Sequence, residues 1–147
     1  MKIYEVELDD AVSEKLIQLS KNWAAENSCH GYRANEKSDI EGNRIFIAED
    51  NDEIIGYLFG KNCKSEQMSS IMPEGTSYFE VEEIYVVQQR RCEGIGEALF
   101  RHVEKTVKGQ ADYIVLSTAT KNWKAILHFY IDELDMQFWS ARLFKRI

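Results

Sequence analysis

The side chains best suited to acid–base chemistry gather in one stretch, between Glu80 and Gly96. Glu80, Glu82 and Glu83 lie on or beside a predicted strand, where alternation places Glu80 and Glu82 on one face and Glu83 on the other. A carboxylate in a cleft can take a proton from an amine, often through a water molecule. Glu82 is therefore a candidate base, although solvated strand-edge charge is an equally ordinary interpretation. For Glu80 and Glu83 the solvated charge is favoured, with attraction of a cation as a milder role.

A glycine-bearing turn follows the same strand. The stretch Val81–Val87 is rich in β-branched and aromatic residues, and the Gly94–Gly96 segment leads into apolar residues at helical spacing. Strand, short turn and helix together point unpaired N–H groups and the positive helix end at one place, which suits an anion such as phosphate. A nucleotide-triphosphate loop is excluded because Glu97 stands where it requires lysine, and a dinucleotide fold wants a third glycine. The plain alternative is a turn whose glycines only permit close packing.

The rest of the chain predicts the elements that support this stretch. Alternating or apolar runs predict strands, helical spacing after a capping residue (Asp9 or Asp10, then Asn122) predicts helices, and polar segments predict loops beside the site. The run from Tyr113 to Leu116 is apolar throughout, as in a strand buried on both faces. Expected strands are 2–7, 44–49, 53–60, 77–87, 111–118, 136–139 and 141–147, expected helices are 11–24, 97–109 and 123–134, and expected loops are 26–42, with one short helix, and 61–76.

Composition bounds the possible functions. The 147 residues fit one domain, spanning 1–147, and 44% of them are hydrophobic. A net charge of −7 argues against nucleic acid as the main partner and suits a cationic one. Three widely spaced cysteines without a Cys-x-x-Cys pair argue against a disulfide framework and against zinc, and fit a reducing compartment. No signal peptide or long apolar run is visible, so we expect a soluble, cytoplasmic protein without a membrane partner.

The turn and its surroundings resemble a known enzyme family. Arg91-Cys92-Glu93-Gly94-Ile95-Gly96, directly after a strand and before an amphipathic helix, resembles the pyrophosphate loop of the GCN5-related N-acetyltransferases (GNAT), whose pattern is Arg or Gln, two residues, Gly, one residue, Gly or Ala. The order β-α-(α)-β-β-β-α-β-α-β-β extends the resemblance over nearly the whole chain. It implies a mixed α/β (α+β) fold, with a central, mostly antiparallel sheet flanked by helices. The closing Arg142–Lys145 run is similar to that of the polyamine-type members.

The resemblance also implies a site. Backbone N–H groups of Cys92, Glu93, Gly94, Ile95 and Gly96 would hold the pyrophosphate of acetyl-CoA, with Arg91 adding charge. The strand Ile84-Tyr85-Val86 would lie along the coenzyme, and the Val86 amide would face the thioester carbonyl, where negative charge develops. Asn122 stands near the start of the last helix, as in the family. Glu82 matches a strand glutamate of polyamine and aminoglycoside acetyltransferases. Tyr130 would return a proton to the departing thiolate, although an aromatic residue at helical spacing is more often core.

The expected activity is acetyl transfer from acetyl-CoA to a primary amine, by direct attack in a ternary complex and without a metal. The acceptor would be a small-molecule amine, and the acidic strand favours a small cation. By analogy with the family, the protein would form a homodimer. Two alternatives stay open. One is an acyl-CoA-binding sensor of the same fold without turnover, and the other is an interaction domain whose glycine turn is incidental.

Overall fold

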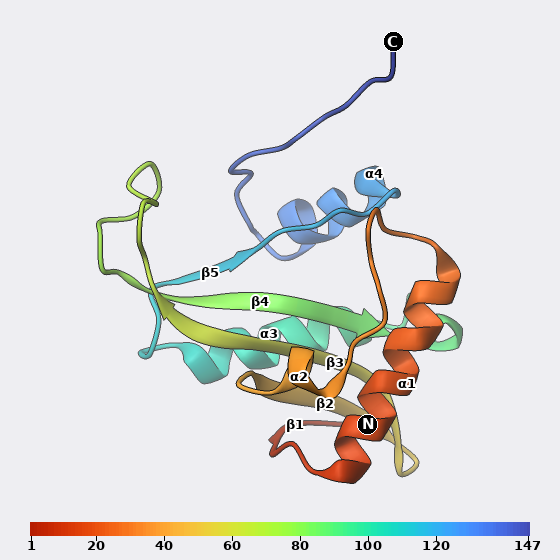
Figure 1. Cartoon of the computed structure of the whole chain (residues 1–147). Helices are drawn as coiled ribbons and strands as arrows, with labels where there is room; N and C mark the ends of the chain where they lie inside the picture. Colours follow the sequence, from red (N-terminus) through yellow and green to blue (C-terminus); the bar gives the residue numbers. More distant parts are fainter.

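Five strands form one sheet in the computed structural model, which describes residues 1–147 (Figure 1). The spatial order is the chain order, with antiparallel pairing from the first strand to the fourth and parallel pairing between the fourth and the fifth. The mixed, mostly antiparallel sheet is therefore confirmed. The strands are β1 (Lys2–Val6), β2 (Arg44–Asp50), β3 (Glu53–Lys64), β4 (Ser77–Val86) and β5 (Tyr113–Leu116).

Helices cover both faces of this sheet. One face carries α1 (Asp10–Glu26) and the short α2 (Lys37–Ile40), and the other carries α3 (Ile95–Val107) (Figure 1). α1 begins at the predicted cap, because Val12 N donates to Asp9 Oδ1 at 2.8 Å. The predicted last helix forms in two parts, α4 (Trp123–Leu127) and the π-helix η2 (His128–Glu133). None of the helices is long and apolar enough to cross a membrane.

The two faces differ in their cores. Towards α3 the buried cluster is hydrocarbon, with Phe46, Leu58, Phe79, Leu99 and Val103 at its centre. Towards α1 the buried cluster contains tyrosines among its apolar side chains. Its members are Leu16, Leu19, Ile40, Ile45, Ile47, Tyr57, Phe59 and Tyr85.

A β-bulge interrupts the pairing of β3 with β4. Phe59 is opposite Glu83 and Gly60 is opposite Val81, so Glu82 is an extra residue in β4. Only glycine fits opposite the bulge, because a Cβ at Gly60 would lie 2.1 Å from the Glu80 carbonyl oxygen. The bulge also corrects the predicted alternation: Glu83 now faces α1, on the side of the sheet that strict alternation assigned to Glu80 and Glu82.

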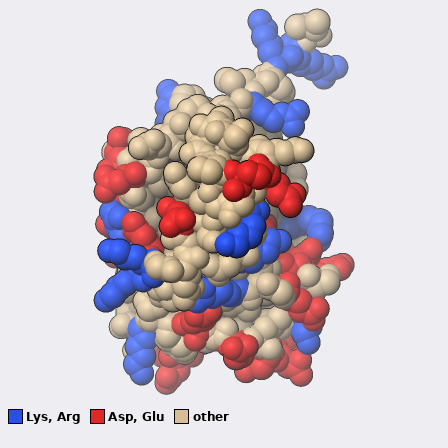
Figure 2. Space-filling model, turned by 90° about the vertical axis from the view of Figure 1, so that its left-hand side faces the viewer, with Lys and Arg blue, Asp and Glu red and all other residues tan.

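The C-terminal segment differs from its prediction. The strands expected at 136–139 and 141–147 are not formed, and the chain runs away from the body after η2 (Figure 1). Asp135, in the left-handed region at φ +59°, turns the chain there, and β5 offers only four residues as a template. Leu143 and Phe144 are 91% and 84% exposed. The basic end of this tail stands clear of the body (Figure 2).

The expectation that β5 is buried on both faces was also wrong. β5 is the last strand of the sheet, and Tyr113 is 40% exposed. An apolar run predicts burial only if further elements cover it, and the missing closing strands leave this edge open.

Candidate functional site

β4 and β5 separate at one end of the sheet. They pair from Tyr78 opposite Tyr113 to Val81 opposite Leu116, and β4 then continues to Val86 without this partner, so the two backbones diverge and leave an unpaired, V-shaped gap between the strands (Figure 1). Because Val87 N donates to Ile55 O of β3 at 2.9 Å, alternation turns the N–H groups of Ile84 and Val86 towards the gap. The Tyr85 amide accordingly faces β3, and its side chain faces α1. The gap thus has backbone donors along one wall.

The turn after β4 ends in a helix with an uncapped N-terminus. A 3₁₀ turn, η1 (Gln88–Arg90), is followed by two left-handed residues, Cys92 at φ +64° and Gly94 at φ +81°. No side chain caps the start of α3, which leaves its first N–H groups for another acceptor. A Cβ at Gly94 would meet nothing within 4 Å, so the turn is open above this residue. The predicted loop residues Cys92 to Gly96 therefore combine two left-handed residues with an uncapped helix start.

The arginines of this turn point to neighbouring elements. Arg91 donates to both carboxylate oxygens of Glu26 at 2.6 and 2.9 Å, and to the Val86 carbonyl oxygen at 3.0 Å. Arg90 donates to Asp50 at 3.0 Å and to Glu93 at 3.1 Å. The guanidinium charge that was expected at the pyrophosphate is thus paired with carboxylates. Glu93 likewise uses its side chain to hold Arg90.

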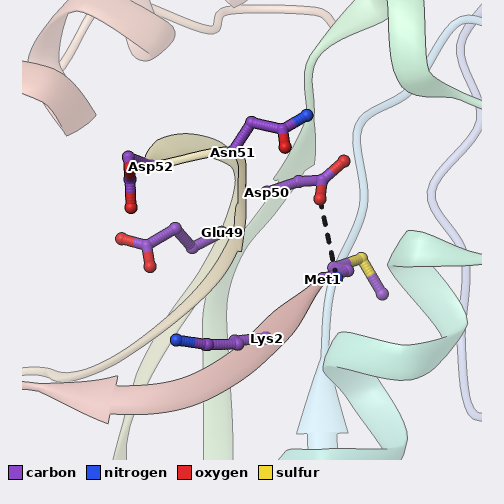
Figure 3. A pocket seen from close by; sticks show the side chains of 6 residues that line it. All are labelled: Met1, Lys2, Glu49, Asp50, Asn51 and Asp52. Carbon is purple, nitrogen blue, oxygen red and sulfur yellow. Dashed lines mark ion pairs between the residues drawn. The ribbon is translucent and has the colours of Figure 1, made fainter.

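Asp50, the partner of Arg90, lines a hollow beside the β2–β3 turn. The hollow is lined by Met1, Lys2, Glu49, Asp50, Asn51 and Asp52 (Figure 3). Asp50 bridges two cations there, since its other oxygen lies 3.5 Å from the Met1 amino group. These contacts lower the pKa of Asp50, with the Arg90 hydrogen bond as the main cause. The lining of the hollow is polar apart from Met1, and Asp50 anchors the turn after β4 there.

The bulge gives the three strand glutamates different surroundings. Glu82 has a 40% exposed side chain and one cationic neighbour, Lys61 Nζ at 3.6 Å. Burial raises the pKa of Glu80, with Glu82 adding like-charge repulsion and Lys61 opposing both effects. Glu82 is thus the glutamate whose carboxylate remains open to a ligand.

Glu83 is enclosed in a hydrogen-bond network. Its carboxylate accepts bonds from Asn35 Nδ2 at 2.9 and 3.0 Å, from Tyr57 Oη at 2.9 Å and from Tyr32 Oη at 3.3 Å. Burial raises the pKa of Glu83, against the lowering effect of these donors. The solvated charge expected for Glu83 was wrong. The side chain instead ties the loop after α1 to the middle of the sheet.

Tyr130 lies over the gap, on the α3 side. It packs with Phe100 and Leu134, next to Ile84 of β4 and Leu116 of β5. Its hydroxyl bonds to no group of the chain, yet the only buried side-chain polar atom without a partner is Asn43 Oδ1, so the Tyr130 oxygen reaches solvent. Burial of the ring, with the Cys29 thiol nearby, raises the pKa of Tyr130 to about 12. The phenol keeps its proton at neutral pH and can donate it.

The loop after α1 crosses the open end of the gap. His30 N donates to Ala119 O at 2.9 Å and Lys121 N donates to Ser28 O at 2.8 Å, so this loop joins the chain that leaves β5. Asn122 follows directly. It occupies the cap position of α4 but makes no capping bond with its side chain, contrary to the predicted cap. A groove of about 570 Å³ lies between the end of α1 and the turn after β4. It is lined by Asn22, Ala25, Glu26, Ser28, Tyr85, Val87, Gln88 and Gln89.

Three residues of this region were missed by sequence reasoning. Glu26, Asn35 and Tyr57 contact the turn or the strand glutamates from segments far away in the chain. The loop 26–42 was predicted to lie beside the site because it is polar. That composition is the only signal in the sequence that indicated Glu26 and Asn35. For Tyr57 there was none, because a tyrosine in an apolar strand is typical of any core.

Comparison with known proteins places the chain among acetyltransferases. A family model described as the acetyltransferase (GNAT) family matches residues 8–132. The tetramutant of the BH1408 protein from Bacillus halodurans has a TM-score of 0.73 at 20% identity, with 100% of both chains covered. An aminoglycoside acetyltransferase from an uncultured soil metagenomic sample has a TM-score of 0.72 at 16% identity, covering 99% of this chain and 97% of that chain.

A structure of the aminoglycoside N-acetyltransferase AAC(6')-Iy in complex with CoA has a TM-score of 0.69 at 16% identity, covering 99% of this chain and 98% of that chain. No curated protein matches the sequence. At these identities the solved structures show the shared fold.

Proposed function

The chain belongs to the acetyltransferase (GNAT) family, and we propose that it moves an acetyl group from acetyl-CoA to a primary amine by direct attack in a ternary complex. The uncapped start of α3, next to an open turn, carries the proposal. An anionic diphosphate suits this place because N–H groups and the positive helix end converge on it. The backbone from Cys92 to Gly96 would hold the diphosphate, and the N–H groups of Ile84 and Val86 would bind along the gap. Asn122, at the start of α4, offers a free amide side chain to the coenzyme.

The proposed chemistry assigns one role to each of three groups, two from β4 and one from η2. Bound acetyl-CoA supplies an activated carbonyl, and the amine nitrogen forms a C–N bond as the C–S bond breaks. Glu82 takes the proton of the attacking nitrogen, directly or through a water molecule. The Val86 N–H donates to the carbonyl oxygen as its charge grows. Tyr130 returns a proton to the sulfur, a role for which its accessible hydroxyl is suited.

We propose a small cationic amine as the acceptor. The overall charge of −7 and the accessible Glu82 favour a cation, and two of the similar folds are described as aminoglycoside acetyltransferases. The acceptor would approach from the α1 side of the sheet, past the loop that crosses the gap.

Binding of the coenzyme is the first test. Isothermal titration with acetyl-CoA should give a saturable signal, and Gly94→Glu should remove it because this variant places bulk and negative charge in the turn. ATP is the control anion. No binding of acetyl-CoA would overturn the proposal, whereas binding without thiol release across a panel of amines would favour a sensor over an enzyme.

Turnover is tested at Tyr130 and Glu82. Tyr130→Phe should lower turnover by about 10²-fold and leave the dissociation constant of acetyl-CoA unchanged, because only the proton donor is lost. Tyr113→Phe, on the exposed edge strand, is its matched control. Glu82→Gln should lower turnover, and the rate should then need a higher pH, with Glu80→Gln as the control. Wild-type turnover in Tyr130→Phe or Glu82→Gln removes that residue from the mechanism.

A further inference from the structure

One stripe of α1 contacts both the loop after the helix and the turn after β4. Ser20, Trp23 and Glu26 are spaced by three residues, so they lie along one side of the helix. The Ser20 hydroxyl bonds to Tyr32 Oη at 2.6 Å. The Trp23 ring stacks on Tyr32 at 4.2 Å and on Tyr85 at 5.3 Å between ring centroids. The last member, Glu26, is therefore held in place by the packing of the turn of helix before it.

Glu26 accepts three hydrogen bonds from two partners on the other side of the groove. Only 14% of its side chain is exposed, and it accepts two bonds from Arg91 and a third from Tyr85 Oη at 2.8 Å. The Arg91 and Tyr85 bonds together outweigh burial and lower the pKa of Glu26. A bidentate arginine–carboxylate pair of this kind fixes direction as well as distance.

Arg91 in turn has three of its five N–H donors committed to neighbouring elements. Its Nε bonds to the Val86 carbonyl oxygen, its two terminal nitrogens bond to Glu26, and its guanidinium carbon lies 5.3 Å from the centre of the Tyr85 ring. The guanidinium group lies between α1 and β4, and 38% of the side chain is exposed. Its charge is neutralised there, before any anion reaches the backbone of the turn.

We propose that Glu26 is a positioning residue for the coenzyme turn, which it holds in its binding shape through Arg91. Arg91 is then a strut between α1 and β4 and not a ligand of the diphosphate. This inference rests on the proposed function. Arg90, the preceding residue, is paired with Asp50 at the end of β2, so the start of the same turn is anchored to two elements.

Titration calorimetry with coenzyme A distinguishes a strut from a ligand, because the two roles predict opposite changes in affinity when Glu26 is substituted. If Arg91 is a strut, Glu26→Gln breaks the pair and the turn loses its shape. The dissociation constant of coenzyme A should then rise about 10-fold, because the binding groups are mispositioned. As a ligand, Arg91 would be freed from its carboxylate, and binding would stay equal or become tighter. Glu53→Gln, which breaks the exposed 3.3 Å pair with Lys15, is the matched control and should change nothing.

Arg91→Lys gives a second, independent comparison. Lysine keeps the positive charge and binds phosphate well. It cannot make the bidentate pair with Glu26 and at the same time bond to the Val86 carbonyl oxygen. The strut therefore predicts weaker binding of coenzyme A, and a ligand predicts binding close to wild type.

The outcomes distinguish this inference from the function on which it rests. If the wild-type protein does not bind coenzyme A, both fail. If it binds and Glu26→Gln binds equally or more tightly, only the strut fails. Melting temperatures of both variants, measured without coenzyme, show whether the fold survives. If Glu26→Gln does not fold, Arg91→Lys alone decides, and near-wild-type affinity in that variant overturns the inference.

Discussion

The two faces of the sheet are buried by different chemistry. Against α3 lie hydrocarbon side chains such as Leu99 and Phe79, which make no directional bonds. Against α1 lie Tyr57 and Glu83, joined to each other and to the loop after α1 by hydrogen bonds. Apolar packing tolerates changes of shape that keep volume, whereas a buried polar network holds each member in one direction.

This difference separates stability from positioning. The α3 face supports the sheet and the start of α3. The α1 face arranges the loop beside the gap, and it does so at the cost of burying a carboxylate that no cation neutralises. Removal of hydrocarbon from the α3 face should lower the free energy of unfolding alone, whereas removal of a hydroxyl from the α1 face should also release the loop that it orients. Single substitutions can therefore distinguish the two faces.

The largest effect is expected on the hydrocarbon face. Leu99→Ala leaves a cavity under β3, where Leu99 Cδ1 would lie 3.2 Å from a Cβ at Gly56. The free energy of unfolding should fall by about 2–5 kcal/mol, measured by denaturant titration. The affinity of the folded fraction for acetyl-CoA should stay close to wild type. A loss of stability below about 1 kcal/mol would contradict the division of roles.

Substitution on the polar face should cost less stability, but it should also change the protection of the loop after α1. Tyr57→Phe removes one donor to the buried Glu83 and should lower the free energy of unfolding by about 1–3 kcal/mol. Hydrogen exchange in the segment that contains Asn35 should accelerate, because the network joins that loop to the sheet. Tyr4→Phe removes an exposed 3.1 Å bond to Glu49 and is the matched control. Unchanged exchange in Tyr57→Phe would show that the network does not hold the loop.

The pH dependence of stability should differ between wild type and Glu83→Gln. Burial raises the native pKa of Glu83, so between its unfolded and native values the native state binds more protons than the unfolded state. The free energy of unfolding contributed by this group is therefore full below the unfolded pKa and falls as pH rises through the native one. Glu83→Gln lacks this loss, so its stability relative to wild type should improve from pH 5 to pH 7, by less than the Tyr57→Phe effect. A difference that does not change with pH contradicts a buried, protonatable Glu83.

The smallest effect is expected where neither face is involved. Deletion of residues 141–147 removes side chains that are almost fully exposed, apart from the edge contact of Phe144 with His30. The free energy of unfolding should change by about 0.5 kcal/mol or less. A loss above about 1 kcal/mol would show that the tail packs on the body in solution, as the predicted closing strands require.

Local patterns predicted most of this fold, and contacts between distant segments account for the rest. Alternation, a capping aspartate and the glycines of the turn placed β1 to β4, α1 and α3, since each of these signals acts within a few residues. The face of Glu83 was mispredicted because a bulge depends on Gly60, in another strand, and alternation carries no information about an extra residue. The closing strands were expected from the same alternation, which cannot say whether a partner edge is long enough.

The candidate site divides in the same way. The turn from Arg91 to Gly96 was indicated by its glycines between a strand and a helix and by its resemblance to the family's loop, and Tyr130 was indicated by the family's layout of the last helix. The partners of Arg91 and Glu83 come from α1, its following loop and β3, and no residue type or spacing in those segments indicates a carboxylate across the sheet. Ion pairs between separate elements become visible only once the fold brings them together.

The absent side chain at Gly60 has a consequence for how this protein can diverge. Two neighbouring acids, Glu82 and Glu83, serve an open surface and a closed network because one extra residue is accommodated opposite a glycine. Any substitution at position 60 would push on the Glu80 carbonyl oxygen, and relief of that clash would realign both acids at once. Glycine at position 60 is therefore a condition for the present orientation of both acids, although it carries no functional group itself.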